Sequence, residues 1–445
     1  MKYSIGIRRE DLSKKGEERV AISPSLLQKI SQKGNICLVQ SAVHPKTGER
    51  KRRFKDQAFK EAGASIQEDL SDADFIFGLK EIEIDQLLEE KTYFIFSHTH
   101  KGQIKNRPML QALVDKKCSL VDYELITHLN GPRVLTAFTY FAGYAGMADS
   151  LWTLDKRSDY LPPNQLKQSV DYEDMGELYE TLDDLASQIE KEGTNDSRPP
   201  LIIAFLGNGK TSTGAQEIID RLPSKEISLA ELQDSFENGS RKYVYKLVLD
   251  IPDMYRLKAS HQSLHGKLSQ KDLFHLYLQQ PELFESNMDQ VYPYCSMWMN
   301  CIIWSNKYPR LISREQAKDW YRQSQVLEVI GDITCDPEGA IQFSAETWID
   351  EPVFIYNPLT NESNRGFDGT GFAVMAVTNL PCEFPADAST QFSENFEPLV
   401  EPLLKANFHV AEFEQANLPP EIANACILWK GKFTPKYAYM QEYLG

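Results

Sequence analysis

The sequence feature that most constrains the fold is residues 201–222, which read LIIAFLGNGKTSTGAQEIIDRL. A pair of prolines precedes an apolar run, glycines then punctuate a turn, and an amphipathic segment follows. This order predicts a strand, a tight loop and a helix. We expect Gly207 and Gly209 to let the backbone approach a ligand, and Gly214 to let the helix pack closely on its strand. The free N–H groups at the start of that helix suit a pyrophosphate.

Three interpretations of this loop stay open. Its GxGxxxxG spacing is a loose relative of the dinucleotide-binding fingerprint, whereas similar glycine loops also occur without any ligand. The letters AFLGNGKT are nearly a phosphate-binding P-loop, but that motif requires a glycine where Ala204 lies in the apolar strand. Under the dinucleotide interpretation, the expected cofactor contacts are Gly207, Asn208, Gly209, Lys210, Thr211 and Gly214.

Asp250 is the candidate partner of the cofactor ribose, because it closes the apolar run KYVYKLVL. In dinucleotide-binding folds an acidic residue about 20 residues beyond the glycine loop binds the ribose. Asp250 is farther along the chain than that, and a short strand expected at residues 226–228 would intervene.

Composition excludes several classes of protein. The chain has 445 residues, 42% hydrophobic and 25% charged, which is ordinary for a globular protein of two or three domains. A formal net charge of −16 argues against a nucleic-acid partner. The seven cysteines form no CxxC pair, which indicates reduced thiols. Without an apolar signal core or a run of membrane-spanning length, we expect a soluble, cytoplasmic protein that does not bind membranes.

No metal site is expected from the sequence. His261 and His265 lie four residues apart, and His98 and His100 lie two apart, but no third ligand accompanies either pair.

Short apolar runs alternate with segments of helical periodicity from the N-terminus to about residue 137. This alternation predicts a parallel sheet covered by helices, so residues 1–137 are expected to form one doubly wound domain. Ligands of such sheets gather at the carboxyl ends of the strands. The polar residues that follow the apolar runs there are Arg8, Arg9, Lys80, His98 and Glu124.

Lys80 and His98 would share a site if their strands are adjacent or one strand apart. A lysine whose pKa is lowered by its surroundings can act as a base near neutral pH, and a histidine can act as the complementary acid or base. The alternative is that both are ordinary solvated residues, which strand ends of this kind carry in any case.

The rest of the chain predicts a second domain and a return to the first. Residues 138–344 contain the glycine loop and further buried runs, and are expected to form the dinucleotide-binding domain. The last hundred residues return to amphipathic helices. The predicted fold is α/β, with two doubly wound Rossmann-like domains, a cleft between them, and a discontinuous first domain made of residues 1–137 and 345–445.

A collinear set of motifs covers essentially the whole chain: IRRE, EERVAISP, LKE, FSHTHKGQ, VDYE, GPRV, FAGYAGM, LGNGKTSTGAQ, NCIIW, GDIT, NLPCEFPADAS and KYAYMQ. In this order they resemble the lysine-2-oxoglutarate reductases, most closely the reductase half of bifunctional aminoadipic semialdehyde synthase. The chain is more distantly similar to lysine-forming saccharopine dehydrogenase and to the N-terminal domain of alanine dehydrogenase and transhydrogenase. The resemblance implies that L-lysine, 2-oxoglutarate and a reduced nicotinamide cofactor give saccharopine, as in lysine degradation.

The resemblance also implies roles for individual residues. Lys80 of LKE and His98 of the SH motif match the acid–base pair, and Asp332 of GDIT falls among the cofactor contacts. Two arginines match positions near substrate carboxylates, which suit the planar set of donors of a guanidinium. Two glutamates match carboxylates that line the site and tune Lys80 and His98. These four residues are Arg19, Arg133, Glu81 and Glu124.

NADP is the expected cofactor, with NAD as the second choice. The sequence stops after KYAYMQ, where a bifunctional relative would continue into a saccharopine-cleaving domain, so we expect a monofunctional reductase. The alternatives are an NAD-dependent saccharopine dehydrogenase that runs toward L-lysine, a P-loop nucleotide hydrolase, and a catalytically silent nucleotide-binding relative. The oligomeric state is not predicted.

Overall fold

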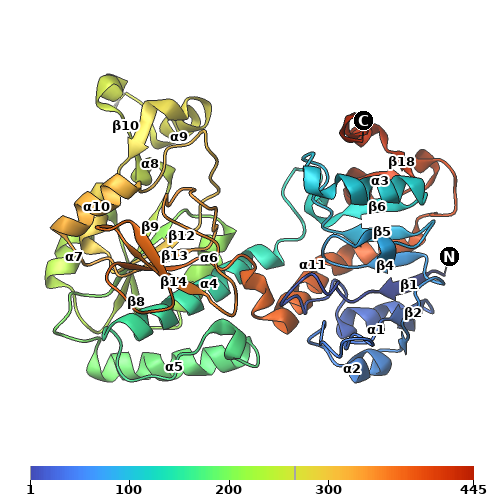
Figure 1. Cartoon of the computed structure of the whole chain (residues 1–445), viewed down its shortest axis with the longest axis horizontal. Helices are drawn as coiled ribbons and strands as arrows, with labels where there is room; N and C mark the ends of the chain where they lie inside the picture. Colours follow the sequence, from blue (N-terminus) through green and yellow to red (C-terminus); the bar gives the residue numbers. More distant parts are fainter. Residues whose placement is uncertain (1, 265–266, 445) are drawn as a thin grey trace. The chain divides into compact units, whose positions relative to one another are not determined.

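The computed structural model describes residues 2–264 and 267–444. The chain divides into two compact units, Met1–Phe138 with Pro385–Gly445, and Thr139–Phe384 (Figure 1). Each unit is built on its own eight-stranded, mainly parallel sheet with helices between the strands. The predicted fold class, α/β with two doubly wound sheets, is confirmed.

The first unit contains the strands β1 Ser4–Ile7, β2 Ile36–Val39, β3 Ser65–Ile66, β4 Phe75–Phe77, β5 Thr92–Ile95, β6 Ser119–Asp122, β17 Cys426–Trp429 and β18 Lys432–Phe433. Their order across the sheet is β18-β17-β6-β5-β4-β1-β2-β3, and only β17 and β18 run antiparallel to their neighbours. The chain fills one side of β1 with β2 and β3 before it crosses to β4, β5 and β6. The strand order therefore reverses between β1 and β4, where sheets of this kind bind ligands.

The α-helices of the first unit are α1 Pro24–Gln32, α2 Asp56–Glu61, α3 Arg107–Asp115, α11 Pro385–Lys405 and α12 Pro420–Ala425. Helix α11 begins where the chain returns from the second unit. Its buried residues Phe392 and Phe396 belong to the same core cluster as Phe77 and Phe94 of the sheet. The ring centroids of Phe396 and Phe77 lie 5.9 Å apart. The apolar face of α11, which lies late in the sequence, thus covers strands formed by the beginning of the sequence.

The second sheet contains β7 Ile202–Leu206, β8 Ser224–Ile227, β9 Val244–Leu249, β12 Met297–Asn300, β13 Val329–Asp332, β14 Val353–Asn357, β15 Glu362–Arg365 and β16 Phe372–Met375. Their order is β15-β14-β16-β13-β12-β7-β9-β8. The pairs from β8 to β16 are parallel, whereas β14 and β15 add an antiparallel edge. Here the order reverses at β7, which lies between β9 and β12.

The helices of the second unit are α4 Ala137–Arg157, which begins at the end of the first unit, α5 Met175–Glu192, α6 Lys210–Ile219, α7 Leu232–Asn238, α8 Ile251–Met254, α9 Gln270–Gln279 and α10 Arg314–Gln323. Two further strands, β10 Tyr255–Leu257 and β11 Phe284–Ser286, form a separate antiparallel pair. No helix in the described ranges is long and apolar enough to cross a membrane.

The boundary between the units differs from the expectation over residues 345–384. The sequence pattern predicts this segment in the first domain, whereas in the structure it belongs to the second unit. The reason is strand pairing, since β16 pairs in parallel with β13 and is paired on its other side by β14. The return to the first unit begins only at α11.

Candidate functional site

The segments that follow β4 and β5 lie side by side. The N–H of Gly78 donates to the carbonyl of Phe94 (3.1 Å), and the N–H of Phe96 donates to the carbonyl of Leu79 (2.8 Å). Because β4 and β5 are adjacent parallel strands, Lys80 and His98 emerge at neighbouring positions on the same edge of the sheet. The strand order reverses next to these positions, between β4 and β1.

Buried Glu10 determines the backbone path into Lys80. Its Oε1 accepts the N–H of Leu79 (2.8 Å) and its Oε2 accepts the N–H of Lys80 (2.9 Å), although only 2% of Glu10 is exposed. Burial raises the pKa of this carboxyl, and the Arg8 charge opposes that effect. Within the described ranges, Nζ of Lys80 has no hydrogen bond or ion pair to the protein. The backbone of Lys80 is therefore fixed, while its side-chain amine is available to a ligand.

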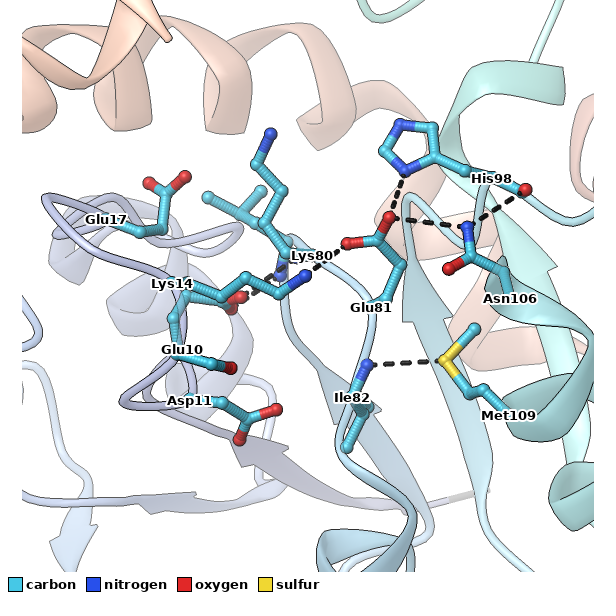
Figure 2. Close-up of polar contacts among 12 residues, drawn as sticks. Glu10, Asp11, Lys14, Glu17, Lys80, Glu81, Ile82, His98, Asn106 and Met109 are labelled. Carbon is cyan, nitrogen blue, oxygen red and sulfur yellow. Dashed lines mark hydrogen bonds and ion pairs between the residues drawn. The ribbon is translucent and has the colours of Figure 1, made fainter. Parts of the chain in front are cut away.

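Glu81 connects the two candidate catalytic positions. Its Oε1 lies 2.8 Å from Nδ1 of His98, and its Oε2 accepts a hydrogen bond from Nζ of Lys14 (2.6 Å). Asn106 donates to the carbonyl of His98 (3.2 Å). Figure 2 shows the Lys80 side chain and the His98 ring rising above the Glu81 carboxylate in this view.

The charges of this cluster determine which atom of His98 can exchange a proton. Burial alone would raise the pKa of Glu81, but the hydrogen bond from His98 and the hydrogen bond and charge of Lys14 outweigh it and hold that pKa well below its usual range. Glu81 is therefore ionised near neutral pH and can only accept hydrogen bonds. Nδ1 of His98 must carry a proton, which leaves Nε2 as the atom that takes up or releases one.

The backbone of His98 adopts an uncommon conformation. Its φ is 49°, in the left-handed region that a residue with a side chain seldom occupies. Buried Asp122, at the end of β6, accepts the N–H of Ser97 (3.0 Å) and also the Ser97 hydroxyl. Neighbouring interactions thus stabilise a strained turn, and strain of this kind is concentrated at functional sites.

A second ion cluster surrounds Glu124, which follows β6. Its Oε1 accepts hydrogen bonds from Arg133 (2.8 Å) and Lys101 (3.1 Å), and Nε2 of His100 lies 3.9 Å from Oε2. Burial would raise the pKa of Glu124, but the hydrogen bond and charge of Lys101, with smaller contributions from His100 and Arg133, lower it. The side chain of Arg133 is 56% exposed, so a ligand can reach its guanidinium.

Arg19 lies in a different environment from Arg133. Only 3% of Arg19 is exposed, and its Nε and Nη2 both donate to the carboxylate of Glu17, at 2.8 and 2.7 Å. The guanidinium also lies over the Phe138 ring, 4.2 Å from its centroid. The planar fork predicted for a substrate carboxylate is therefore engaged by a carboxylate of the protein.

The glycine loop of the second unit joins β7 to α6, as predicted. Gly207 has a φ of 104°, and its N–H donates to the carbonyl of Leu249 (2.9 Å). A Cβ on Gly207 would lie 2.9 Å from Ile302, whereas a Cβ on Gly209 would meet no atom within 4 Å. The open space over Gly209 lies at the N-terminus of α6, where free N–H groups favour an anion. Asn208 and Lys210 are exposed beside it, and Thr211 is half-buried.

Gly214 serves a different contact from the one expected. A Cβ there would lie 2.4 Å from the carbonyl oxygen of Tyr140 in α4. On the opposite helix, a Cβ on Gly143 would lie 2.1 Å from the carbonyl oxygen of Thr211. Gly214 therefore permits α6 to pack closely on α4.

The two acidic cofactor candidates are unlike each other. Asp250 is exposed and directly follows β9, the strand that pairs with β7. Asp332 is 1% exposed, and its Oδ1 accepts hydrogen bonds from Asn300 (2.8 Å) and Thr334 (3.2 Å). Burial raises the pKa of Asp332. The carboxylate of Asp332 thus ties together the segments that follow β12 and β13, while Asp250 faces solvent.

Four residues that position the site are absent from the sequence predictions. Glu10 and Asp122 lie within the quoted motifs IRRE and VDYE, so buried acids next to strand ends were a usable signal. Lys14 and Asn106 lie outside every motif, and only the tertiary structure brings them to Glu81. In the described part of the chain, no group of three or more His, Cys, Asp or Glu residues is arranged to hold a metal ion. His265 lies outside the described residues.

Each sheet carries a candidate site near the place where its strand order reverses, and this arrangement is typical of one class of dehydrogenase fold. The family model described as "Alanine dehydrogenase/PNT, N-terminal domain" matches residues 6–145. Among solved structures, an L-alanine dehydrogenase covers 99% of this chain with a TM-score of 0.63 and 16% identity. A transhydrogenase from Sinorhizobium meliloti covers 97% with a TM-score of 0.58 and 14% identity. The chain has the alanine dehydrogenase and transhydrogenase fold.

Sequence similarity identifies nearer relatives. The chain is 32% identical to alpha-aminoadipic semialdehyde synthase of Arabidopsis thaliana, over 98% of this chain and 41% of that protein. It is 28% identical to the mitochondrial enzyme of Rattus norvegicus, over 98% of this chain and 47% of that protein. A saccharopine dehydrogenase [NAD(+), L-lysine-forming] of Emericella nidulans is 22% identical, over 87% and 88% of the two chains. The chain is thus a homologue of these oxidoreductases, as its motifs indicated, and spans less than half the length of the synthases.

Proposed function

We propose that the chain catalyses the NAD(P)H-dependent reductive condensation of L-lysine with 2-oxoglutarate to give saccharopine. The observation that carries the proposal is the placement of Lys80 and His98 at the ends of adjacent strands, oriented by Glu10 and Glu81. The similarity to alpha-aminoadipic semialdehyde synthases supports the proposed substrate class.

The chemistry requires proton transfers that these two residues can make. The ε-amine of L-lysine must be neutral to attack the keto carbon, and the resulting carbinolamine must gain a proton on oxygen to leave as water. We propose that Lys80 accepts the amine proton, and that Nε2 of His98 supplies the proton to the departing oxygen. The imine that remains takes a hydride at carbon and a proton at nitrogen, which gives saccharopine.

The substrates bring three carboxylates, which need cationic partners. We propose Arg133 for one of them because its guanidinium is exposed, with Glu124 beside it to accept an ammonium group of L-lysine. Arg19 is the candidate for a second carboxylate, and contact with it requires the Arg19–Glu17 pair to loosen. A lysine side chain in place of arginine cannot form the two parallel N–H hydrogen bonds of a guanidinium. Arg133→Lys and Arg19→Lys should therefore each raise KM for 2-oxoglutarate.

The second unit has a loop that fits a dinucleotide. Space for a pyrophosphate lies over Gly209 at the start of α6, and a side chain at that position would fill it. We propose that Gly207, Asn208, Gly209, Lys210 and Thr211 hold the phosphates. Bound NAD(P)H supplies the hydride for imine reduction.

The direct test follows nucleotide absorbance with L-lysine and 2-oxoglutarate, each omitted in turn, and identifies the product by mass. We expect oxidation only when both substrates are present, with one saccharopine formed per nucleotide consumed. Equal rates with pyruvate and ammonia would instead indicate an alanine-dehydrogenase-like enzyme. Semialdehyde and glutamate as products would contradict a purely condensing reaction.

The reverse reaction is the second candidate. It is favoured by the similarity to the L-lysine-forming saccharopine dehydrogenase, of which this chain covers 88%. The same residues would serve both directions, because a reaction and its reverse share one transition state. Comparing kcat/KM for saccharopine with NAD(+) against that for the condensation at one pH distinguishes the preferred direction.

A further inference from the structure

One short loop carries side chains of both ion clusters at the candidate site. We call residues 98–103, which follow β5, the histidine loop. His98 belongs to the first cluster, whereas His100 and Lys101 approach Glu124 of the second. The position of this loop therefore determines where three side chains of the candidate site lie.

The C-terminal 3-10 helix η12 Pro435–Tyr443 is anchored on the sheet of the first unit. Tyr437 is buried, and its hydroxyl donates to the carbonyl of Asn424 (2.6 Å). Met440 is also fully buried. Both side chains belong to a core cluster that contains residues of β5 and β6. Because these anchors lie within the helix, its other side chains are held at fixed places.

Two tyrosines of η12 contact the histidine loop. Gly102 has a φ of 69°, and a Cβ on it would lie 2.9 Å from the Tyr443 ring. Arg107 lies over the same ring, 5.6 Å from its centroid, and donates to the carbonyl of Gly102 (3.3 Å). The hydroxyl of Tyr439 donates to the carbonyl of His100 (3.2 Å). The loop thus meets the helix through a ring packed on its glycine and through a hydrogen bond to its backbone.

We propose that η12 holds the histidine loop in its catalytic position, with Tyr443 and Tyr439 as positioning residues. This inference rests on the proposed condensation reaction and gives the C-terminal helix a part in it. Neither tyrosine contacts a substrate, since both act through the loop that carries His98.

The loop needs such support because of its backbone. His98 has a φ of 49°, and a residue with a side chain persists in that region only where surrounding contacts determine it. The start of the loop is held by Asn106, which donates to the carbonyl of His98 (3.2 Å), whereas the tyrosines contact its later residues. A displacement of about 1 Å at a catalytic group can lower a rate about 100-fold. Contacts at both parts of the loop therefore bear on turnover.

The first test separates the ring of Tyr443 from its hydroxyl. We expect Tyr443→Ala to lower kcat for saccharopine formation about 10- to 100-fold, and Tyr443→Phe to restore it, because the contact uses the ring. KM for the nicotinamide nucleotide should not change, since the glycine loop belongs to the second unit. A wild-type kcat in Tyr443→Ala would overturn the proposal.

The second test has the opposite pattern at Tyr439. Its contact uses the hydroxyl, so Tyr439→Phe and Tyr439→Ala should lower kcat equally, by about two- to tenfold, the range of one hydrogen bond. The matched control is Tyr243→Ala, which removes an exposed tyrosine of the second unit and should leave kcat unchanged. Full activity in Tyr439→Phe would reject the role of this hydroxyl.

Amide hydrogen exchange measures the loop without any turnover. In the full chain without substrates, residues 98–103 should exchange about tenfold faster in Tyr443→Ala than in the wild type and in Tyr443→Phe, while β5 and β6 exchange alike in all three. Unchanged exchange of the loop in Tyr443→Ala would refute the contact as its support.

The two measurements distinguish this inference from the proposed reaction. Faster loop exchange in Tyr443→Ala, in a protein that forms no saccharopine, would reject the reaction and keep the support of the loop by η12. Saccharopine formation that is equally fast in the wild type and in Tyr443→Ala would support the reaction and reject the positioning role.

Discussion

At the scale of single residues, Glu81 gives the site its electrostatic character. It is the common partner of His98 and Lys14, and it keeps its negative charge because their hydrogen bonds outweigh its burial. It thereby determines that Nε2 of His98 is the exchangeable atom. Lys80, one residue earlier, is held by a different acid, Glu10, through its backbone alone. Two glutamates thus orient two bases without pairing with the Lys80 amine.

We expect Lys80→Met and His98→Gln each to lower kcat by about 100 to 10,000-fold, the usual contribution of a positioned acid–base group. KM should change far less, because neither side chain is proposed to hold a substrate carboxylate. Steady-state kinetics across pH would measure both quantities. The controls are Lys60→Met and His275→Gln, which alter exposed residues of the same types. Turnover at the wild-type rate would show that these are ordinary strand-end residues.

Glu81→Gln should lower the free energy of unfolding at pH 7 by about 2 kcal/mol, because it removes charge-assisted hydrogen bonds in a partly buried site. The pKa of Glu81 is depressed in the folded state, so its contribution is present above the ordinary carboxyl pKa of about 4.3 and is lost as pH falls through the folded value. Urea unfolding from pH 3 to 8 would measure this. The difference between wild type and variant should shrink at acid pH, and a constant difference would contradict this assignment.

At the scale of secondary-structure elements, glycines in one loop and helix perform separate tasks. Gly209 leaves open space at the start of α6, while Gly214 and Gly143 allow α6 and α4 to approach until backbone atoms meet. We propose a ligand for the first feature, whereas the second feature serves helix packing. A sequence pattern does not separate them, because each appears only as a glycine at a given spacing.

This division of tasks predicts opposite phenotypes for two substitutions. Gly209→Val should fold normally, because its φ of −93° and ψ of −176° are extended backbone and its Cβ meets nothing, but its affinity for NADH and NADPH should fall at least about tenfold. Gly143→Ala should lose about 1 to 3 kcal/mol of stability by overpacking α6. Thermal unfolding and nucleotide titration of both variants would measure this. Undiminished nucleotide affinity in folded Gly209→Val would reject the phosphate site.

At the scale of the whole molecule, the second unit contains a buried pair of carboxyl groups. Asp149 of α4 and Glu383, just before α11, are both almost completely buried. A hydrogen bond between the two carboxyl groups contributes to the pKa of each. Burial raises the pKa of Asp149 to about 6, and burial and the Asp149 charge raise that of Glu383 well above its usual value. The pair is stable only while it retains a proton.

The raised pKa values imply a stability that falls as pH rises. The contribution of the pair is complete below the ordinary carboxyl pKa of about 4 and is lost as pH rises through about 6 and beyond. Glu383→Gln is neutral without taking up a proton, so it should be more stable than wild type at pH 8 by about 2 kcal/mol, an advantage that disappears near pH 4.5. Thermal unfolding across this range measures the effect. The control Glu180→Gln, at an exposed site of α5, should show no such trend.

Much of the architecture followed from the sequence because its signals are local. Alternating apolar runs and helical periodicity determine that strands and helices form, and apolar strands between helices must lie in a parallel sheet. The glycine loop indicated the second unit, and the motif order indicated the relatives to which the chain is similar. The polar residues after each apolar run gave Lys80 and His98 as candidates for one site, since the carboxyl ends of parallel strands lie on the same side of the sheet, and the pairing of β4 with β5 made them neighbours.

Tertiary structure decided which residues meet, because strand order and burial depend on contacts between distant segments. Pairing of β16 with β13 moved residues 345–384 into the second unit. Insertion of β9 beside β7 brought Asp250 to the glycine loop despite an intervening strand. Asp332 is buried, and Arg19 forms an ion pair with Glu17 of the same unit. The sequence by itself determined the elements and the chemical groups at their ends, and only packing determined which of those groups face a ligand.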